Sequence, residues 1–480
     1  MNIDESTLQR IVDWGLEKGA SYVEARYHDI DGFLVNTRND KVIGISHERE
    51  YGVGIRVIVN GALGFSATSD LSIESLAKAL ESAISRARAL SRLRRKPIEF
   101  ADDKLGSVKY NVYEKKPILS HYTPIDARSL LIEIYKLANE AVRESKIPAL
   151  IGFARSYYER KIILNSDGGR IESTIPRVYL SSMATLINQR GSIQRRIEFG
   201  ASGGAEKIAE WNVLEKVQEE LKAIENVLLK GVEPPSEKVT VVLSSEVVGL
   251  IVHESSGHPM EADRILGREA AQAGESYVKP EMIRKYRVGN EYANVVEDPT
   301  IPGSYGFYLY DEECVRARPR YLYREGLLYE PLHNRHTARL FGGYSNGAAR
   351  AMNYASEPII RMSNTYLAPG EMEFDELIED VELGLYVKSY MEWNIDDARW
   401  NQRYVGLESY MIRNGELAEP VRNPVLEFTT GWFYSNIQGV DKNLKFYPGT
   451  CGKGEPSQGV PVWFGGPNVK LNKIRVGVLG

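Results

Sequence analysis

The sequence is poor in cysteine, in long apolar runs and in excess charge of either sign. Only Cys314 and Cys451 occur among 480 residues, which is too few for a disulfide framework. Residues 1–10 lack the basic and then apolar pattern of a signal peptide, so we expect both thiols to be reduced. The longest apolar stretch, Val239–Val252, is interrupted by serines and a glutamate, and no segment is apolar enough to span a bilayer. These absences predict a cytoplasmic protein without a membrane partner.

The charge balance also excludes one class of partner. A net charge of -5 argues against overall electrostatic attraction to nucleic acid, so no direct nucleic-acid binding is expected. Hydrophobic residues make up 43% of the chain and charged residues 26%, which is typical of globular proteins. At 480 residues the chain is large for a single hydrophobic core. We therefore expect two or more domains.

The order of helix and strand patterns predicts an α+β fold in two segments. Helical spacing is seen near residues 4–19, 73–87, 127–144 and 206–230, and strand-like alternation lies between these segments. Asn60-Gly61 predicts a tight hairpin, and Ser166–Gly169 a second turn. The Pro-rich stretch Gly231–Lys238 suggests a domain boundary. We expect an N-terminal domain of mixed helices and strands at 1–233 and a mostly β C-terminal domain at 234–480, which carries a metal-binding helix.

The stretch HESSGHPMEAD, residues 253–263, contains two histidines five positions apart. On a regular helix these side chains would point about 140° apart, because each residue turns the helix by about 100°. Either a π-bulge or a helix end near Gly257 could bring His258 back towards His253. Two imidazoles supply half of a zinc site, and Glu254 would lie beside a metal-bound water and could take its proton.

A zinc site needs a third ligand that is soft or anionic. Glu261 and Asp263 are near in sequence, whereas Cys451 is distant and stands between two glycines in PGTCGKGEP. Such glycines offer no side chains to pack around a buried cysteine, so Cys451 is the predicted third ligand. Cys314 follows three carboxylates, which discourage a thiolate.

Six motifs are spread along the chain: YGVGIRVIVNGALGF (51–65), HESSGHPMEADRI (253–265), DPTIPGSYGFYLYDEE (298–313), REGLLYE (324–330), PIIRMSNTYLAPG (358–370) and GTCGKGEPSQGVPVWFGGP (449–467). Together, and in this order, they resemble the TldD branch of the TldD/PmbA family of metallopeptidases. The resemblance implies that His253, His258 and Cys451 bind one zinc ion per chain and that Glu254 is catalytic. It further implies cleavage of unfolded or small peptides inside a closed chamber, by a heterodimer with a PmbA-type subunit or by a homodimer.

Two other readings compete with this one. The chain could be a non-catalytic peptide-binding or scaffold subunit whose metal is structural or absent, although such a site has no need of Glu254. Another zinc amide hydrolase, similar to peptide deformylases, would be shorter and would have histidines four positions apart.

Further residues are candidates for binding the substrate. Polarisation of the scissile carbonyl could come from His333, His336, Arg361 or Tyr366. The segment RMSNTYLAPG, residues 361–370, could form a sheet edge that pairs with the peptide backbone. Trp463 and Phe464 could line a substrate tunnel. The carboxylates Asp298, Asp311, Glu312 and Glu313 match no calcium loop and are predicted to lie in turns and at the surface.

Overall fold

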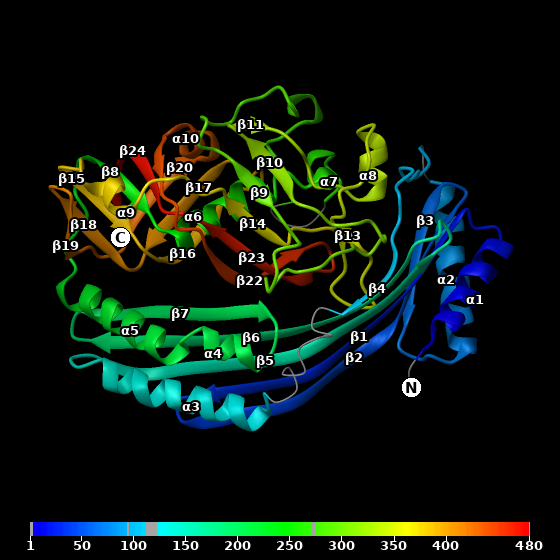
Figure 1. The fold of residues 1–480 in the computed structure, drawn as a ribbon, viewed down its shortest axis with the longest axis horizontal. Helices are drawn as coiled ribbons and strands as arrows, with labels where there is room; N and C mark the ends of the chain where they lie inside the picture. Colours follow the sequence, from blue (N-terminus) through cyan, green and yellow to red (C-terminus); the bar gives the residue numbers. More distant parts are fainter. Residues whose placement is uncertain (1–2, 94–95, 112–121, 270–273, 480) are drawn as a thin grey trace.

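The computed structural model describes residues 3–93, 96–111, 122–269 and 274–479, and a long curved sheet forms its N-terminal part (Figure 1). The strand order is β3-β2-β1-β5-β6-β4, with β7 also paired to β6, and only the β4–β6 pair is parallel. The strands are β1 (Tyr22–Arg38), β2 (Lys41–Val59), β3 (Ala62–Thr68), β4 (Ser107–Asn111), β5 (Lys146–Asn165), β6 (Arg170–Asn188) and β7 (Gly191–Ser202).

Two pairs of helices cover different ends of this sheet (Figure 1). Helices α1 (Glu5–Glu17) and α2 (Ile73–Ser91) share one hydrophobic core with β1 and β2. Helices α3 (Pro124–Ala141) and α5 (Val213–Lys230) form a second core with β5, β6 and β7. The single helix predicted near 206–230 is divided, because Asn212 has a left-handed φ of 49° between α4 (Ala205–Glu210) and α5.

The predicted turns of the sheet are confirmed. Asn60 and Gly61 both have positive φ, 51° and 73°, as the predicted two-residue hairpin between β2 and β3 requires. Gly168, with φ 91°, lies in the turn between β5 and β6. Asp4 caps α1 by accepting a hydrogen bond of 2.9 Å from the N–H of Thr7.

The C-terminal part is mostly β and lies over the concave side of the first sheet (Figure 1). One six-stranded sheet has the order β11-β10-β9-β14-β23-β22, another the order β19-β18-β15-β8-β24-β21, and smaller sheets have the orders β16-β17-β20-β25 and β12-β13. The strands are β8 (Lys238–Leu243), β9 (Val295–Glu297), β10 (Arg320–Arg324), β11 (Leu327–Leu328), β12 (Ala349–Arg350), β13 (Ile359–Ile360), β14 (Asn364–Leu367), β15 (Leu383–Val387), β16 (Tyr390–Ile395), β17 (Asn401–Gly406), β18 (Ser409–Arg413), β19 (Glu416–Pro420), β20 (Pro424–Thr429), β21 (Ile437–Val440), β22 (Lys445–Lys453), β23 (Gln458–Gly466), β24 (Val469–Arg475) and β25 (Gly477–Val478). The helices are α6 (Ser245–Val252), a π-helical turn η2 (His253–Gly257), α7 (Ala262–Ile265), a 3₁₀ turn η3 (Pro280–Met282), α8 (Arg335–Leu340), α9 (Phe374–Ile378) and α10 (Thr430–Ser435).

This arrangement confirms the predicted α+β class and the mostly β character of the C-terminal part. The strands of the first sheet all precede residue 203, and those of the other sheets all follow residue 237. The boundary between residues 233 and 234 lies in the connection and stays a prediction. Within the described residues, no helix combines the length and the apolarity that crossing a bilayer demands.

Buried ion pairs connect the first sheet to the segment that follows residue 310. Arg56 pairs with Glu313 at 2.9 Å, and Glu312 pairs with Lys161 at 2.6 Å and with Arg26 at 3.3 Å. Burial tends to raise the pKa of Glu312, but Lys161 and Arg26 outweigh it and lower the pKa to about 2. The prediction that these carboxylates lie at the surface is therefore wrong.

The same correction applies to Asp311, whereas Asp298 agrees with the prediction in part. Asp311 is also buried, and its side chain accepts hydrogen bonds from the backbone N–H groups of Glu313, Val315 and Ala349. Asp298 is half-buried and does lie in a turn, where it accepts a bond from the N–H of Thr300.

Candidate metal centre

The helix with the two histidines is wholly buried and begins directly after a central strand. Strand β8 lies between β15 and β24 in its sheet. All eight residues of α6 are buried, as expected for a helix that is apolar around its circumference. Ser244 occupies the N-cap position, but its hydroxyl donates to the carbonyl of Lys388 at 2.5 Å instead of capping the helix.

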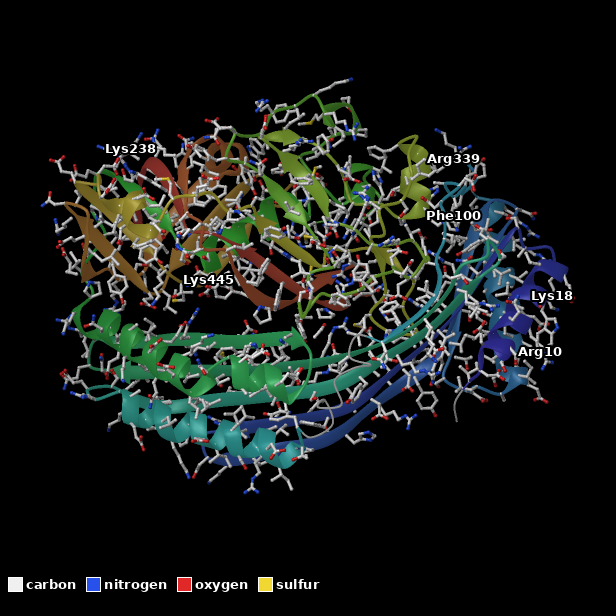
Figure 2. The ribbon with its side chains drawn as sticks, viewed as in Figure 1. Arg10, Lys18, Phe100, Lys238, Arg339 and Lys445 are labelled. Carbon is white, nitrogen blue, oxygen red and sulfur yellow. The ribbon has the colours of Figure 1, made fainter. Side chains whose placement is uncertain are left out.

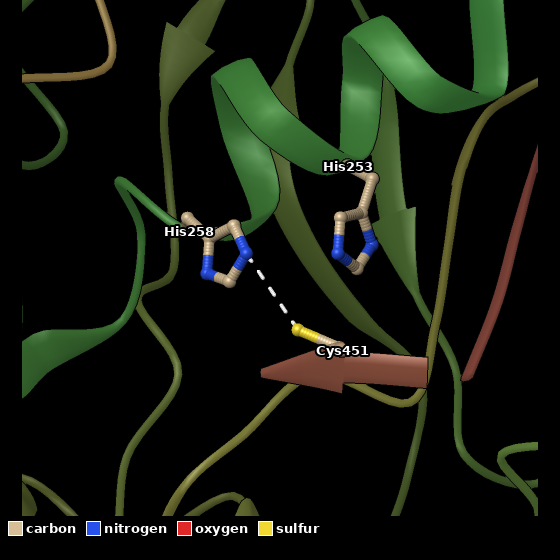
Figure 3. A group of neighbouring side chains, drawn as sticks. All are labelled: His253, His258 and Cys451. Carbon is tan, nitrogen blue, oxygen red and sulfur yellow. Dashed lines mark hydrogen bonds between the residues drawn. The ribbon is translucent and has the colours of Figure 1, made fainter. Parts of the chain in front are cut away.

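The five-residue spacing of the histidines is absorbed by a π-helical turn, which was one of the two expected possibilities. The backbone N–H of His258 donates to the carbonyl of His253 at 3.3 Å, an i to i+5 hydrogen bond. This wider turn brings both imidazoles to one side of the helix, as Figure 3 shows. Their ring centroids lie 5.1 Å apart, with the rings nearly perpendicular at 82°.

Cys451 completes the group from the opposite side, on strand β22 (Figure 3). Its Sγ lies 3.6 Å from Nε2 of His258, and the ligand atoms of the two histidines and the cysteine all lie within 4.8 Å of one another. In a tetrahedral zinc site, bond lengths near 2.0 Å to nitrogen and 2.3 Å to sulfur separate neighbouring ligand atoms by about 3.3 to 3.6 Å. The three side chains, all buried, thus form a candidate metal site whose donor set fits zinc, and the distance between His258 and Cys451 matches that of neighbouring zinc ligands.

The electrostatics of the group favour a thiolate at Cys451. Burial alone would raise the pKa of this thiol, but His258, His253 and Arg361 outweigh burial and hold it well below its usual value. The thiolate in turn raises the pKa of His253 against the effect of burial. Cys314 is different, because burial and the nearby carboxylates raise the pKa of its thiol well above normal, in agreement with the expectation from sequence.

Glu261 and Asp263, the other candidates for a third ligand, have supporting positions instead. Glu261 lies 3.0 Å from Nδ1 of His258, so its carboxylate can fix the orientation of that imidazole. Lys453 donates to both oxygens of Asp263, at 2.7 and 2.8 Å, and lies 3.4 Å from Glu261. Since Lys453 follows Cys451 by two positions on one strand, both side chains leave the same face of β22, a signal that the sequence contained.

Glu254 is buried beside the metal group and forms an ion pair with Arg399. Arg399 comes from the loop between β16 and β17, 145 residues further along the chain. No motif in the sequence pointed to this arginine, because the loop DDARW has no recognisable spacing to the histidines.

The four residues predicted to polarise a carbonyl have different partners. Arg361 does lie beside it, and donates to the carbonyls of Cys451 and Gln458. His333 contacts the hydroxyl of Thr337, His336 contacts the carbonyl of Glu99, and the ring of Tyr366 packs on that of Phe446. Only Arg361 of the four is thus brought to the candidate metal site.

A groove of about 910 Å³ runs between β7 of the first sheet and β22, and we call it the inter-sheet groove. Its lining includes Arg195–Phe199 on one side and Lys445–Pro448 on the other, and Figure 2 places Lys445 between the two parts of the molecule. Phe464 also lines the groove, and its ring centroid is 6.3 Å from that of His253. Trp463 packs on Phe446 and donates to the carbonyl of Gly200.

The predicted sheet edge at residues 361–370 is wrong. Strand β14 pairs with β9 on one side and with β23 on the other, so its backbone is engaged inside the sheet. In the described part of the chain, β22 is one of the two edge strands of this sheet, because it pairs with β23 alone.

Comparisons with known proteins agree along the length of the chain. Residues 23–88, 119–227 and 236–478 match, in turn, domain 1, the central domain and the C-terminal domain of the PmbA/TldA metallopeptidases. A protein of Methanothermobacter thermautotrophicus named "Metalloprotease" is 31% identical over 99% of this chain and 100% of its own length. The "Zinc metalloprotease TldD homolog" of Saccharolobus solfataricus is 27% identical, over 96% of this chain and 97% of its own.

A solved structure gives the same picture of the fold. The crystal structure of TldE from Thermococcus kodakarensis has a TM-score of 0.76 to this chain at 15% identity, and covers 98% of this chain and 100% of its own. At that identity the likeness concerns the fold alone. With three successive domains matched and a relative 31% identical over nearly its whole length, the chain belongs to the PmbA/TldD family of metallopeptidases.

Proposed function

We propose that this metalloprotease is a zinc-dependent peptidase of the HExxxH type that hydrolyses unfolded or small peptides. The observation that carries the proposal is the position of Glu254, a buried carboxylate that directly follows the candidate ligand His253 and pairs with Arg399. A purely structural site of two histidines and a cysteine has no use for such a carboxylate.

The proposed metal follows from the donor set. Two imidazoles and a thiolate are ligands that zinc prefers, and three protein ligands leave a fourth position open, as in catalytic zinc sites. When bound, zinc would lower the pKa of water and polarise a carbonyl. The side chains of His253, His258 and Cys451 would hold it, and Glu261 would keep the ring of His258 oriented.

Glu254 supplies the base of the reaction. Its carboxylate takes a proton from the attacking water, and the water oxygen bonds to the carbonyl carbon of the peptide. The proton then passes to the leaving nitrogen as the C–N bond breaks. Ion pairing to Arg399 orients the carboxylate for this task.

The inter-sheet groove supports a peptide as the substrate. Its volume is in the range of ligand-binding sites, and β7 and β22, which flank it, each pair with a single neighbour among the described strands. An extended peptide can add to such an edge through its backbone, which selects little for sequence and requires an unfolded substrate. β22 also carries Cys451, so a peptide along this strand would run towards the metal site.

The test compares the parent protein with Glu254→Gln and Cys451→Ser, each washed with a mild chelator and resupplied with zinc. We expect about one zinc per chain in the parent and in Glu254→Gln, far less in Cys451→Ser, and cleavage of short unstructured peptides by the parent alone. Turnover by Glu254→Gln would remove this residue from the mechanism. Zinc binding without cleavage by the parent would favour the non-catalytic scaffold.

The assembly and its location belong to the same proposal. We propose that the chain works in the cytoplasm in a two-subunit assembly, either with a PmbA-type subunit or with a second copy of itself. Native mass spectrometry of the purified chain, alone and after co-expression with a PmbA-type subunit, distinguishes these two assemblies from a monomer.

A further inference from the structure

The backbone of Arg399 has an unusual conformation, which several hydrogen bonds hold in place. Its backbone is left-handed, with φ 63°, a conformation that residues with a side chain rarely adopt. Such a conformation persists only where the surroundings impose it.

Hydrogen bonds from three directions impose it here. The backbone N–H of Arg399 donates to the carbonyl of Asp396, and its own carbonyl accepts from the hydroxyl of Thr430 at 2.8 Å. The carboxylate of Asp396 accepts hydrogen bonds from the N–H groups of Trp400 and Asn401, the two residues after Arg399, at 2.7 and 3.0 Å. The carbonyl of Ala398 accepts from the N–H of Tyr277 at 2.9 Å. The loop is thus fixed so that the guanidinium reaches Glu254.

Arg399 places a buried positive charge beside Glu254. Its side chain is only 8% exposed, and that of Glu254 only 11%, so water screens their interaction weakly. Because Glu254 directly follows His253, the guanidinium that pairs with it lies beside the candidate metal group. A buried cation therefore stands at the place where, under the proposed function, the peptide carbonyl is attacked.

We propose that Arg399 is a further catalytic residue, which pairs with Glu254 in the resting enzyme and with the carbonyl oxygen of the scissile bond during attack. The inference rests on the proposed peptidase function. When Glu254 takes the proton from the attacking water, its negative charge is cancelled. As the water oxygen bonds to the carbonyl carbon, the π electron pair of the carbonyl moves to the carbonyl oxygen. The negative charge thus leaves one partner of Arg399 and appears on another.

This exchange has a kinetic signature. The contact between Arg399 and the carbonyl oxygen is strong only in the transition state, so its loss lowers kcat and leaves KM nearly unchanged. Loss of one such donor typically lowers kcat about 100- to 1000-fold. A residue that only stabilised the fold would change the amount of active enzyme and the metal content instead.

The experiment uses Arg399→Gln and the conservative Arg399→Lys, with Arg403→Gln as the matched control. Arg403 lies four positions further on and pairs with Glu392 and Glu427, so its loss changes the net charge equally, away from the site. For each variant, zinc content, peptide kcat and KM, and the affinity for a phosphinic peptide are measured. The phosphinic group mimics the tetrahedral state, and its binding is followed by calorimetry without turnover.

We expect Arg399→Gln to keep its zinc and its KM, to lose about 100-fold or more in kcat, and to bind the phosphinic peptide more weakly by a similar factor. Lysine should restore part of both losses, and the control should match the parent. Unchanged kcat in Arg399→Gln, or equal losses of zinc and activity in both Arg399 variants, overturns the role of Arg399 while the peptidase function stands. A parent that neither cleaves peptides nor binds the phosphinic peptide overturns both.

Discussion

Gly257 lies in the π-helical turn between the two histidines, and its replacement by alanine tests whether close packing shapes the metal site. A Cβ atom at this position would lie 1.9 Å from Sδ of Met362, which is itself fully buried. Ordinary contacts between such atoms are about 3.5 to 4.0 Å, so one side must move by about 1.5 Å or more. Overpacking of a dense core costs about 1 to 3 kcal/mol.

The sign of the effect distinguishes this position from an ordinary helical glycine. Gly→Ala within a helix normally stabilises it by up to about 1 kcal/mol, because alanine has the higher helix propensity. We expect Gly257→Ala to destabilise the protein by about 1 to 3 kcal/mol and to shift His258, which weakens zinc binding about tenfold or more. Gly343→Ala is the control, since nothing lies within 4 Å of the added methyl there.

The assay is a double-mutant cycle with Met362→Ala, read by denaturant unfolding of the metal-free protein and by competition for zinc with a chromogenic chelator. Met362→Ala leaves space for the new methyl, so Gly257→Ala should cost much less in that background, with a coupling of about 0.5 to 3 kcal/mol. An equal cost in both backgrounds would refute the packing argument. So would zinc affinity that is unchanged in the single variant.

Three further predictions concern the surroundings of the site. Glu261→Gln should weaken zinc binding about 10- to 100-fold in the same chelator assay, because His258 loses its carboxylate partner, and equal affinity would contradict that role. The pKa of Glu312 is lowered to about 2, so its contribution to stability is present above pH 4.5 and is lost as the pH falls towards 2. Between pH 4.5 and pH 2, the free energy of unfolding measured in urea should therefore fall by about 3 kcal/mol more in the parent than in Glu312→Gln. Parallel pH profiles of the two proteins would contradict this. After zinc removal, a thiol reagent at neutral pH should label Cys451 before Cys314, with zinc restoring protection of Cys451; peptide mapping that finds Cys314 first would contradict the opposite pKa shifts of the two thiols.

The sequence was informative where chemistry is local. The spacing of the two histidines allowed only a few helix geometries, and one of them, the π-helical turn, is present. Cys451 could be chosen because its flanking glycines argued against simple packing. Asn60-Gly61 determined its hairpin because few residue pairs adopt two positive φ angles.

The sequence was uninformative where partners are distant along the chain. Glu312 and Glu313 were predicted to lie at the surface, because no residue near them in the sequence indicates their ion-pair partners. These partners, Lys161, Arg26 and Arg56, are distant along the chain. The interior position of β14 depends on β9 and β23, and a strand's neighbours in a sheet cannot be derived from its own residues. Arg399 was missed for the same reason, because only the folded chain brings it to Glu254.

The position of strand β8 has a consequence for synthesis of the protein. The strand leads directly into the metal helix, yet one of its two neighbours in the sheet is β24, more than 220 residues later. Cys451 likewise reaches His258 from 193 positions away. A nascent chain on the ribosome therefore has both histidines long before it has the strand that supports them or the thiolate that completes the site. The candidate metal site can therefore be complete only after β22 and β24 have been synthesised.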